Sequence, residues 1–403
     1  LQISKRTEEG LNLDTEKGQS VWVSCMALYN TVNPLKFVAQ FNGSSGLSSL
    51  LAGCIFDSSS MVKKDPKLEK VLREAAMEDN TVVIITLNEA WAAPDSLFDL
   101  FLESLNTGNG TQRLLNHLVV VALDLKAYQR CLTRHPHCYF LTTEGIDFSN
   151  EAQFMTSTYL SMMWRRIDFL RSVLEMGYNY VFSDTDIIWF RDPFPWFFPD
   201  ADFQIACDKF YGNPNDKGNR PNGGFKFVRS NKRTIEFYKF WYGSRDKFPG
   251  IHDQDVLNKI KFDPYIDTIG LKMRFLSTDY FGGFCDPSKD FNVVCTMHAN
   301  CCFGLDNKVK DLRVMLGDWR KYASLNATEK ETHRPTWSDP ENCRYDTDMV
   351  QKFEATIHLF LALLISLLLL FKGVPTHLEG LHSKGNFSVL SSVIEDICYR
   401  TVL

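Results

Sequence analysis

The first half of the chain alternates between short apolar runs and longer segments with helical spacing. Apolar runs of strand length occupy 81–86, 117–124 and 138–141. Helical spacing occupies 67–77, 96–105, 125–134 and 156–176. One apolar stripe runs along the last of these segments, formed by Tyr159, Met163, Ile167, Leu170 and Leu174. Strands that alternate with helices predict an α/β fold, with a mostly parallel sheet that helices cover on both faces.

Past Pro199 the pattern becomes mixed. Strand-like runs occupy 201–207, 225–229, 273–276 and 293–297. A polar loop, 212–222, separates the first two runs, and helical spacing returns at 234–242 and 254–260. The pattern predicts a smaller mixed subregion attached to the main sheet.

The two ends of the chain differ from its centre. Residues 1–65 contain Gly- and Ser-rich patches and are predicted to form a loosely ordered leader or stem. The folded domain is expected at 66–325, which leaves 326–403 as a C-terminal extension. Within that extension 355–374 is largely apolar and long enough to span a bilayer, although a buried helix would have the same composition.

Composition places the chain among ordinary globular proteins and excludes one class of partner. Of its 403 residues, 44% are hydrophobic and 23% are charged. The net charge of -5 and the pI near 6.0 give no electrostatic argument for binding nucleic acid.

Cysteines and glycosylation sequons give information on the cellular compartment in which the protein folds. Several of the 11 cysteines are close in sequence, namely Cys131 with Cys138, and Cys285 with Cys295, Cys301 and Cys302. In an oxidising lumen they would form disulfides, and in the cytosol they would remain buried thiols. Asn-x-Ser/Thr sequons, which favour the secretory route only mildly, occur at Asn42, Asn109, Asn326 and Asn386.

Two carboxylates interrupt the apolar run that begins at Tyr178. Asp184 and Asp186 stand one residue apart, and the β-branched and aromatic residues on both sides indicate a buried strand. Side chains at positions i and i+2 of a strand point the same way, so the carboxylates would converge at the edge where such sheets bind ligands. A divalent ion, magnesium or manganese, would balance their charge. The alternative is a turn in which the carboxylates cap backbone amides.

Other polar residues gather at predicted strand ends and helix starts. Asn222-Gly223-Gly224 precedes a strand, and paired glycines allow a ligand to approach the backbone closely. The run 252–258 opens a helix, where Asp255 could serve only as a cap. His298 lies at a strand end, and Lys308 follows at short range.

Together these residues resemble the nucleotide-diphospho-sugar transferase family of plants, glycosyltransferase family 77, which has the GT-A fold. The resemblance covers roughly 71–325 and is most specific in the run from Trp164 to Phe194. It implies a Rossmann-like sheet of GT-A type, a smaller subregion that faces the acceptor, and a catalytic domain at 66–325. The apolar C-terminal segment departs from the family pattern, in which the anchor is expected near the N-terminus.

The resemblance implies the metal site and the residue that meets the donor diphosphate. Asp184 and Asp186 match the family's metal-binding Asp-x-Asp, and His298 matches a histidine that completes such sites. The alternative for His298 is a core histidine bonded to a carbonyl group. Lys308 resembles the lysine that contacts the diphosphate, with a solvated surface lysine as its alternative.

Further positions resemble contacts of the nucleotide and the sugar. Thr86 and Asn88 resemble the nucleotide-facing elbow after the first strand, or else form an ordinary strand-to-helix turn. Arg166 is a candidate partner of phosphate, unless it forms a surface ion pair. Together with Lys308, the candidate catalytic residues are Asp253 and Gln254, expected beside the anomeric carbon. The remaining positions expected at the sugar are Asp208, Asn222 and Gly223.

The implied activity is transfer of a pentose or galactose from a nucleoside-diphosphate sugar to a cell-wall glycan or glycoprotein. The donor would be uridine diphosphate-arabinose, -xylose or -galactose, the cofactor Mn²⁺ or Mg²⁺, and the configuration at the anomeric carbon would be retained. The expected location is the Golgi membrane, with the catalytic domain in the lumen.

Two other functions fit part of the pattern. A phosphatase of the haloacid-dehalogenase type also places Asp-x-Asp after a strand, but here Ile187-Ile188 replaces the usual following Gly-Thr or Gly-Val. That class also needs a later Gly-Asp-x-x-x-Asp, and Gly317-Asp318 is followed by Tyr322 at the last position. A degenerate transferase domain that only binds carbohydrate or serves as a scaffold is the other alternative.

Overall fold

A computed structural model describes residues 10–14, 20–27, 37–39, 65–143, 145–152, 154–333 and 335–343. The chain divides into two compact units, Leu1–Met61 and Val62–Leu403. The apolar segment predicted at 355–374 lies outside the described residues. Among the helices that are described, none has both the length and the apolar composition needed to cross a membrane.

The first unit contains a small antiparallel sheet that the sequence pattern did not predict. Its strands are β1 (Gly10–Asp14), β2 (Ser20–Ala27) and β3 (Phe37–Ala39), in the order β1-β2-β3. The loosely ordered leader expected at 1–65 thus includes regular strands.

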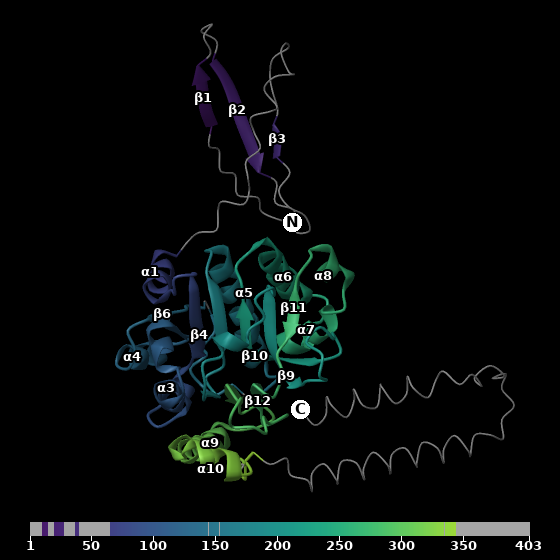
Figure 1. Ribbon diagram of the computed structural model, residues 1–403. Coiled ribbons are helices and arrows are strands. Elements are labelled where there is room, and N and C mark those ends of the chain that lie inside the picture. The colour runs from purple at the N-terminus through teal and green to yellow at the C-terminus, as the bar shows by residue number, and fades with distance from the viewer. Residues whose placement is uncertain are drawn as a thin grey trace, which may run out of the picture. The chain divides into compact units, whose positions relative to one another are not determined.

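The second unit is built on a seven-stranded sheet (Figure 1). Its strands are β4 (Thr81–Leu87), β5 (Leu118–Ala122), β6 (Cys138–Phe140), β7 (Asn179–Ser183), β9 (Phe203–Lys209), β10 (Arg220–Val228) and β11 (Met273–Phe275). Their order is β11-β9-β10-β7-β4-β5-β6, and β10 is antiparallel to both of its neighbours. The other pairings are parallel, which confirms the predicted α/β class with a mostly parallel sheet.

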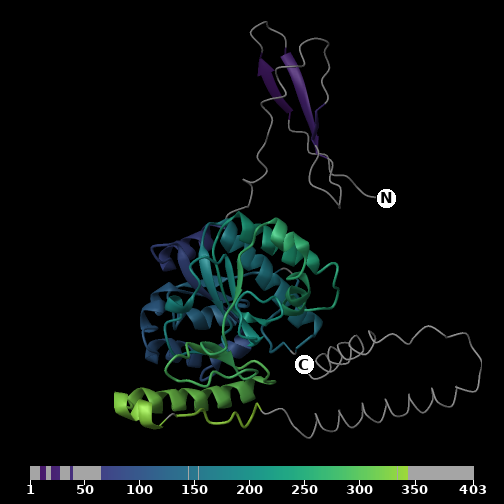
Figure 2. The same ribbon diagram turned by 45° about the vertical axis from the view of Figure 1, so that its right-hand side comes forward.

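Helices cover both faces of this sheet (Figure 2). One face packs against α1 (Pro66–Ala75), α5 (Ser157–Glu175), α6 (Lys232–Ser244), α7 (Asp253–Ile260) and α8 (Pro264–Thr268). The other packs against α2 (Glu89–Ala92), α3 (Leu97–Thr107), the 3₁₀ helix η2 (Gln112–His117) and α4 (Leu125–Leu132). A further 3₁₀ turn, η3, spans Phe194–Trp196. Alternate residues of each strand enter the two cores, as Val82 and Val83 do in β4.

A second, smaller sheet lies below the main one in Figure 1, at the end where α3 follows β4. It consists of β12 (Phe281–Gly283), β13 (Thr296–His298) and β8 (Ile187–Trp189), in that order. The sequence analysis treated the apolar residues on both sides of Asp184 and Asp186 as one strand. They form β7 and β8, which belong to different sheets, because the chain turns between them.

The folded unit extends beyond the predicted boundary at residue 325. Helix α9 (Leu305–Ser324) packs on β8 and α3, and α10 (Ala327–His333) follows it. The Trp337 ring stacks on Phe291 with 3.8 Å between centroids. A disulfide then joins Cys343 to Cys302.

Two further disulfides lie within the described residues, Cys131–Cys138 and Cys285–Cys301. Both join cysteines that the sequence analysis had grouped. Cys295, from the same group, is a buried free thiol. The sequence spacing did not single out Cys343 as the partner of Cys302.

The disulfides should differ in their contributions to stability because they close loops of different length. The bonded cysteines are 41 residues apart in Cys302–Cys343 and 7 residues apart in Cys131–Cys138. Chain entropy predicts losses of about 4 and about 2.5 kcal/mol in the free energy of unfolding when each pair is replaced by alanine. Denaturant melts of the two double variants test this order. Equal losses, or a larger loss for Cys131→Ala/Cys138→Ala, would contradict it.

Candidate active site

The Asp-Thr-Asp sequence forms a tight turn between the two sheets. The Asp184 N–H donates to the Gly224 carbonyl of β10 at 2.7 Å, and the Thr185 hydroxyl donates to the Thr86 carbonyl of β4 at 2.8 Å. These bonds attach the turn to both neighbouring strands. The carboxylates of Asp184 and Asp186 therefore converge through a turn and not through strand alternation. Neither carboxylate caps a backbone amide within the described residues, although the alternative interpretation expected it.

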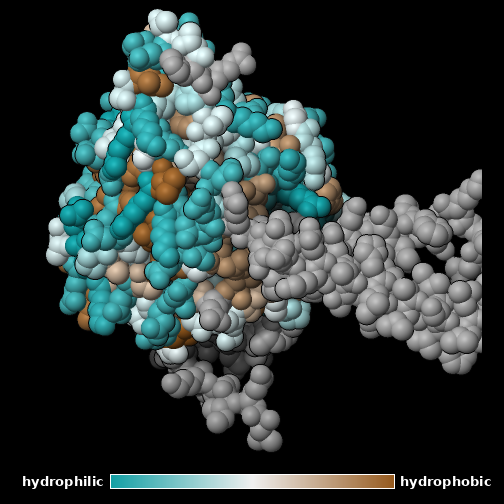
Figure 3. Space-filling model, turned by 90° about the horizontal axis from the view of Figure 1, so that it is seen from below, coloured by the Kyte–Doolittle hydropathy of each residue, from teal (hydrophilic) through white to brown (hydrophobic). Residues whose placement is uncertain are grey.

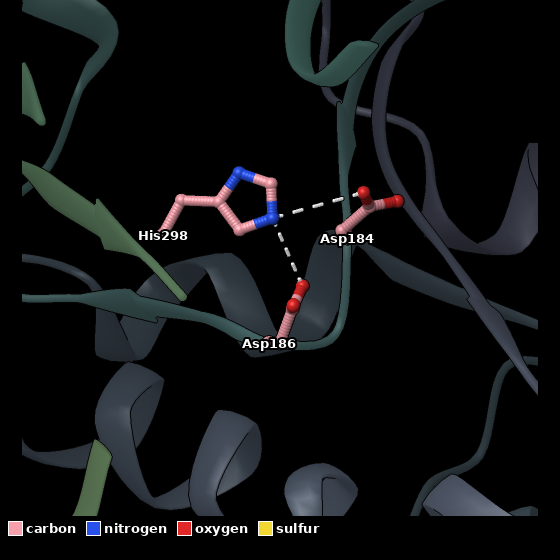
Figure 4. Close-up of side chains that lie close together, drawn as sticks. All are labelled: Asp184, Asp186 and His298. Atoms are coloured by element: carbon pink, nitrogen blue, oxygen red, sulfur yellow. Dashed lines mark ion pairs between the residues drawn. The ribbon is translucent and has the colours of Figure 1, made fainter. Parts of the chain in front are cut away.

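His298 joins the two carboxylates from the small sheet (Figure 4). It pairs with Ile187 across β13 and β8, and the next residue, Ala299, donates its N–H to the Asp186 carbonyl at 3.0 Å. Its Nε2 atom lies 3.1 Å from Asp186 Oδ1 and 3.9 Å from Asp184 Oδ2. One potential ligand atom from each of the three residues lies within 4.8 Å of the others.

These residues fit a divalent metal ion. The Oδ1 atom of Asp186 is buried and faces His298 Nε2, but it accepts no hydrogen bond of good geometry, so its lone pairs are available to a metal ion. Two carboxylates and one imidazole form a donor set that suits Mn²⁺ or Mg²⁺ with further oxygen ligands from water or phosphate.

Lys308 is paired with Asp186 and is not a solvated surface residue. It extends from the first turn of α9, and its Nζ lies 2.6 Å from Asp186 Oδ2. Burial opposes ionisation of Asp186, but the charges of Lys308 and His298 outweigh it and hold the pKa of that carboxyl below its usual range. The carboxylate is therefore charged at neutral pH.

Arg166 is buried and connects two carboxylates of the site. It extends from α5 and is 5% exposed, which excludes the surface ion pair considered as its alternative. Its two terminal nitrogens donate to Asp184 at 2.8 Å and to Asp253 at 3.0 Å. Asp253 is the first residue of α7, and although burial opposes its ionisation, Arg166 keeps its pKa below the usual range. Arg166 thus fixes the candidate catalytic carboxylate of Asp253 beside the metal ligands.

The residues expected at the sugar form one hydrogen-bond network. Gln254 accepts from the Gly223 N–H at 2.8 Å and donates to Asp208 at 2.8 Å. Asn222 donates to Asp208 at 2.7 Å, and Asn300 donates to it at 2.8 Å. Burial raises the pKa of Asp208, and the hydrogen bonds from its amide partners reduce this rise without cancelling it. The structure therefore brings all four predicted residues together.

Thr86 and Asn88 lie at the same edge of the sheet but have local structural contacts. Asn88 caps α2 by accepting from the Trp91 N–H, and its amide donates to the Phe148 and Asn150 carbonyls. These contacts are those of a strand-to-helix turn, the alternative considered for it. The Thr86 carbonyl holds Thr185. Their role at the nucleotide stays a prediction.

Residue-level sequence reasoning missed three residues of the site. Lys226 is fully buried on β10, donates to the Gly223 carbonyl at 2.8 Å, and lies over the Phe182 ring. Burial lowers its pKa to about 7. Asn300 was not proposed as a site residue, and Gly224 was predicted only as one of a pair of glycines, with no role at the metal ligands. A polar residue inside a strand, as at Lys226, was the available signal.

Gly224 is the glycine that the site requires. A Cβ atom there would lie 2.6 Å from His298 Cε1 and 2.7 Å from Asp184 Oδ2, which no side chain tolerates without displacing a ligand. A Cβ atom at Gly223 would meet nothing closer than 3.6 Å. The paired glycines predicted a close approach to the backbone, and the structure requires it at Gly224 and not at Gly223.

Comparison with known proteins identifies the family. A family model described as nucleotide-diphospho-sugar transferase matches residues 113–312, which include the Asp pair, Arg166, Asp253, His298 and Lys308. An uncharacterized protein of Arabidopsis thaliana is 55% identical over 278 residues, which are 69% of this chain and 73% of that protein. This chain belongs to the nucleotide-diphospho-sugar transferase family. It is therefore a glycosyltransferase, as the sequence resemblance implied.

Two more distant relatives have named activities. The Arabidopsis thaliana beta-arabinofuranosyltransferase RAY1 is 29% identical over 124 residues, which are 30% of this chain and 23% of RAY1. The UDP-D-xylose:L-fucose alpha-1,3-D-xylosyltransferase MGP4, also from Arabidopsis thaliana, is 25% identical over 96 residues, or 24% of this chain and 27% of MGP4. Both are transferases that act on sugars.

Replacing Gly224 by alanine should weaken metal binding, because the new Cβ atom pushes His298 and Asp184 apart. Disturbing the support of a metal ligand typically lowers affinity about 10–100-fold. Calorimetric titration of the purified protein with Mn²⁺ measures the change. Gly223→Ala is the matched control and should retain the affinity of the unaltered protein. Equal Mn²⁺ affinities for the two variants would contradict the conclusion that the metal ligands require a glycine at position 224.

Proposed function

We propose that this enzyme transfers a pentose or galactose from a nucleoside-diphosphate sugar to a glycan or glycoprotein acceptor of the cell wall. The reaction would depend on a divalent metal ion and retain the configuration at the anomeric carbon. The observation that carries the proposal is the convergence of Asp184, Asp186, His298 and Lys308 at one edge of the sheet. Family membership supports the donor class, and the names of RAY1 and MGP4 favour pentoses.

The diphosphate would lie at the Asp pair and Lys308. Asp184, Asp186 and His298 would hold Mn²⁺ or Mg²⁺, which when bound supplies Lewis-acid stabilisation of the departing diphosphate. Lys308 adds a cation whose position is already fixed by Asp186. A preorganised charge of this kind stabilises the negative charge that develops on the leaving oxygen.

The sugar would lie against the Asp208 network. Asn222, Gln254 and Asn300 fix the Asp208 carboxylate, leaving it as an oriented hydrogen-bond acceptor for sugar hydroxyls. Asp253 stays ionised beside Arg166 and could stabilise positive charge at the anomeric carbon. In the transfer, the bond from that carbon to the diphosphate oxygen breaks and a bond to the acceptor oxygen forms. The acceptor hydroxyl would pass its proton to an oxygen of the departing diphosphate.

A lumenal location in the Golgi, with membrane association, remains part of this proposal. The three disulfides support an oxidising compartment. The sequon residues Asn109 and Asn326 are both exposed, as glycosylation in the secretory route requires.

The transferase fits better than the two other functions considered. The family match favours transfer, and the residues that the phosphatase class needs after the Asp pair and after Gly317-Asp318 are replaced by Ile187-Ile188 and Tyr322. A domain that only binds carbohydrate has no need of a complete set of metal-ligating side chains. Release of phosphate from simple esters, or nucleotide binding without sugar transfer or hydrolysis, would reverse this preference.

Asp184→Asn and Asp186→Asn should abolish turnover, since each removes a charged metal ligand. Donor hydrolysis should be measured with uridine diphosphate-arabinose, -xylose and -galactose, with Mn²⁺ and with a chelator. We expect each variant, and the chelator, to reduce the rate at least about 100-fold. Asp168→Asn is the matched control, because the ion pairs that Asp168 makes among the described residues are to Arg165 and Arg171 of its own helix, α5. Hydrolysis that persists in both variants would overturn the proposed metal site.

Lys308→Ala should slow the reaction without abolishing it, because it removes one of several charges at the diphosphate. Loss of one such contact typically lowers kcat about 100–1,000-fold. Lys310→Ala on the same helix is the control, since Lys310 is exposed to solvent. A Lys308→Ala variant as active as Lys310→Ala would exclude Lys308 from the leaving-group site.

A further inference from the structure

An aromatic cluster lies beside the candidate active site and has no part in the donor contacts described above. Phe154 is its centre, with ring centroids 5.2 Å from Tyr159, 5.3 Å from His252 and 6.4 Å from Phe303. Tyr159 and His252 are also 6.3 Å apart. The four rings come from three separate segments: Phe154 and Tyr159 from just before and within the first turn of α5, His252 from just before α7, and Phe303 from just before α9.

Two of these rings are exposed although burial would favour them. Phe154 is 37% exposed and Phe303 is 51% exposed, whereas His252 beneath them is 6% exposed. Large aromatic side chains contribute most when buried, so an exposed group of them indicates a binding surface. The surface seen from below the sheet carries several separate hydrophobic patches on a largely hydrophilic face (Figure 3), so exposure alone is not decisive.

The position of the cluster distinguishes it from such scattered patches. His252 immediately precedes Asp253, and its Nδ1 lies 3.6 Å from Asp253 Oδ1. On the other side, the Glu151 carboxylate accepts the N–H of Leu305 at 3.0 Å, which ties the segment before Phe154 to the start of α9. That helix carries Lys308. The cluster therefore contacts the starts of the two helices that carry the candidate catalytic carboxylate Asp253 and the candidate diphosphate residue Lys308.

The cluster also contains a charged imidazole, whose nitrogens face Asp253 and Asp255, and a tyrosine hydroxyl next to its apolar faces. Burial alone would lower the pKa of His252, but Asp253 and Asp255 raise it to about 9, so the imidazole is charged at neutral pH. Burial raises the pKa of Tyr159, so its hydroxyl keeps its proton. A sugar ring matches this combination, since it has an apolar C–H face that stacks on aromatic rings and hydroxyls at its rim.

We propose that Phe154, Tyr159, His252 and Phe303 form the platform on which the acceptor's sugar ring stacks. The proposal rests on the transferase function proposed above. The nucleotide is expected at the end of β4 near Thr86 and Asn88, and the donor sugar at the Asp208 network. His252 of the platform faces Asp253 Oδ1, whereas Arg166 binds Asp253 Oδ2. An acceptor stacked on the platform would therefore bring its hydroxyl to the anomeric carbon beside Asp253.

The test separates acceptor from donor binding in the full chain with Mn²⁺. Phe154→Ala and Phe303→Ala are compared with Phe303→Trp, which keeps an aromatic face. Phe262→Ala is the matched control, because Phe262 is 58% exposed and lies between α7 and α8, outside the site. Donor hydrolysis without acceptor, and transfer to methyl glycosides of fucose, arabinose and galactose, are measured for each variant.

Loss of one stacking face should raise the acceptor KM about 10-fold, with a change below about threefold in the donor KM. Phe303→Trp and Phe262→Ala should keep the acceptor KM of the unaltered chain. A rise in donor KM as large as that in acceptor KM would make the cluster a cover over the donor and overturn the proposal. So would an unchanged acceptor KM, or donor hydrolysis without transfer to any glycoside. Absence of hydrolysis for every donor would instead refute the transferase function itself.

Discussion

The active site depends on a continuous line of buried and partly buried charges. It runs from Lys308 through Asp186 and His298 to Asp184, and on through Arg166 to Asp253. Each carboxylate has a cationic partner from a different element of the fold. Isolated buried charges are costly, and leaving one member of such a pair unpartnered typically costs about 3–5 kcal/mol. The charged groups of the site are therefore all paired only when the whole fold has formed. Once they are paired, moving any one of them would leave its partner unpaired, so the site resists distortion.

The arrangement of the two sheets explains how the line is assembled. The turn between β7 and β8 passes the chain from the main sheet to the small one, with both aspartates at the junction. Helices α5 and α7 pack on one face of the main sheet and contribute Arg166 and Asp253. The small sheet and α9 lie at the edge and contribute His298 and Lys308. Charged side chains from these helices and from the small sheet thus meet where the strands of the main sheet end. The binding position of the donor is therefore fixed before the donor binds.

Much of this could be predicted from sheet topology, residue chemistry and the family resemblance. Alternating strands and helices predicted the main sheet, and strand ends placed Asp184 and Asp186 at its edge, whereas the resemblance assigned His298 to the same site. The turn was missed because both flanks are equally apolar, so the pattern does not reveal a change of sheet. Helix α9 was missed because its buried positions, such as Leu312 and Leu316, are separated by many charged residues. The double pairing of Arg166 and the burial of Lys226 arise from tertiary contacts that no local pattern encodes.

The adjacent cysteines Cys301 and Cys302 impose an order on how the chain matures. One bonds back to Cys285, and the other bonds forward to Cys343, which is synthesised 41 residues later. During vectorial synthesis the first bond can close as soon as its segment has emerged, whereas the second must wait for the residues after α10. The loop that precedes Lys308 is therefore held by its second disulfide, Cys302–Cys343, only after almost all of the described chain has been synthesised. A nascent or truncated chain that stops before Cys343 would carry every group of the active site and still lack one of the restraints that hold α9 in place.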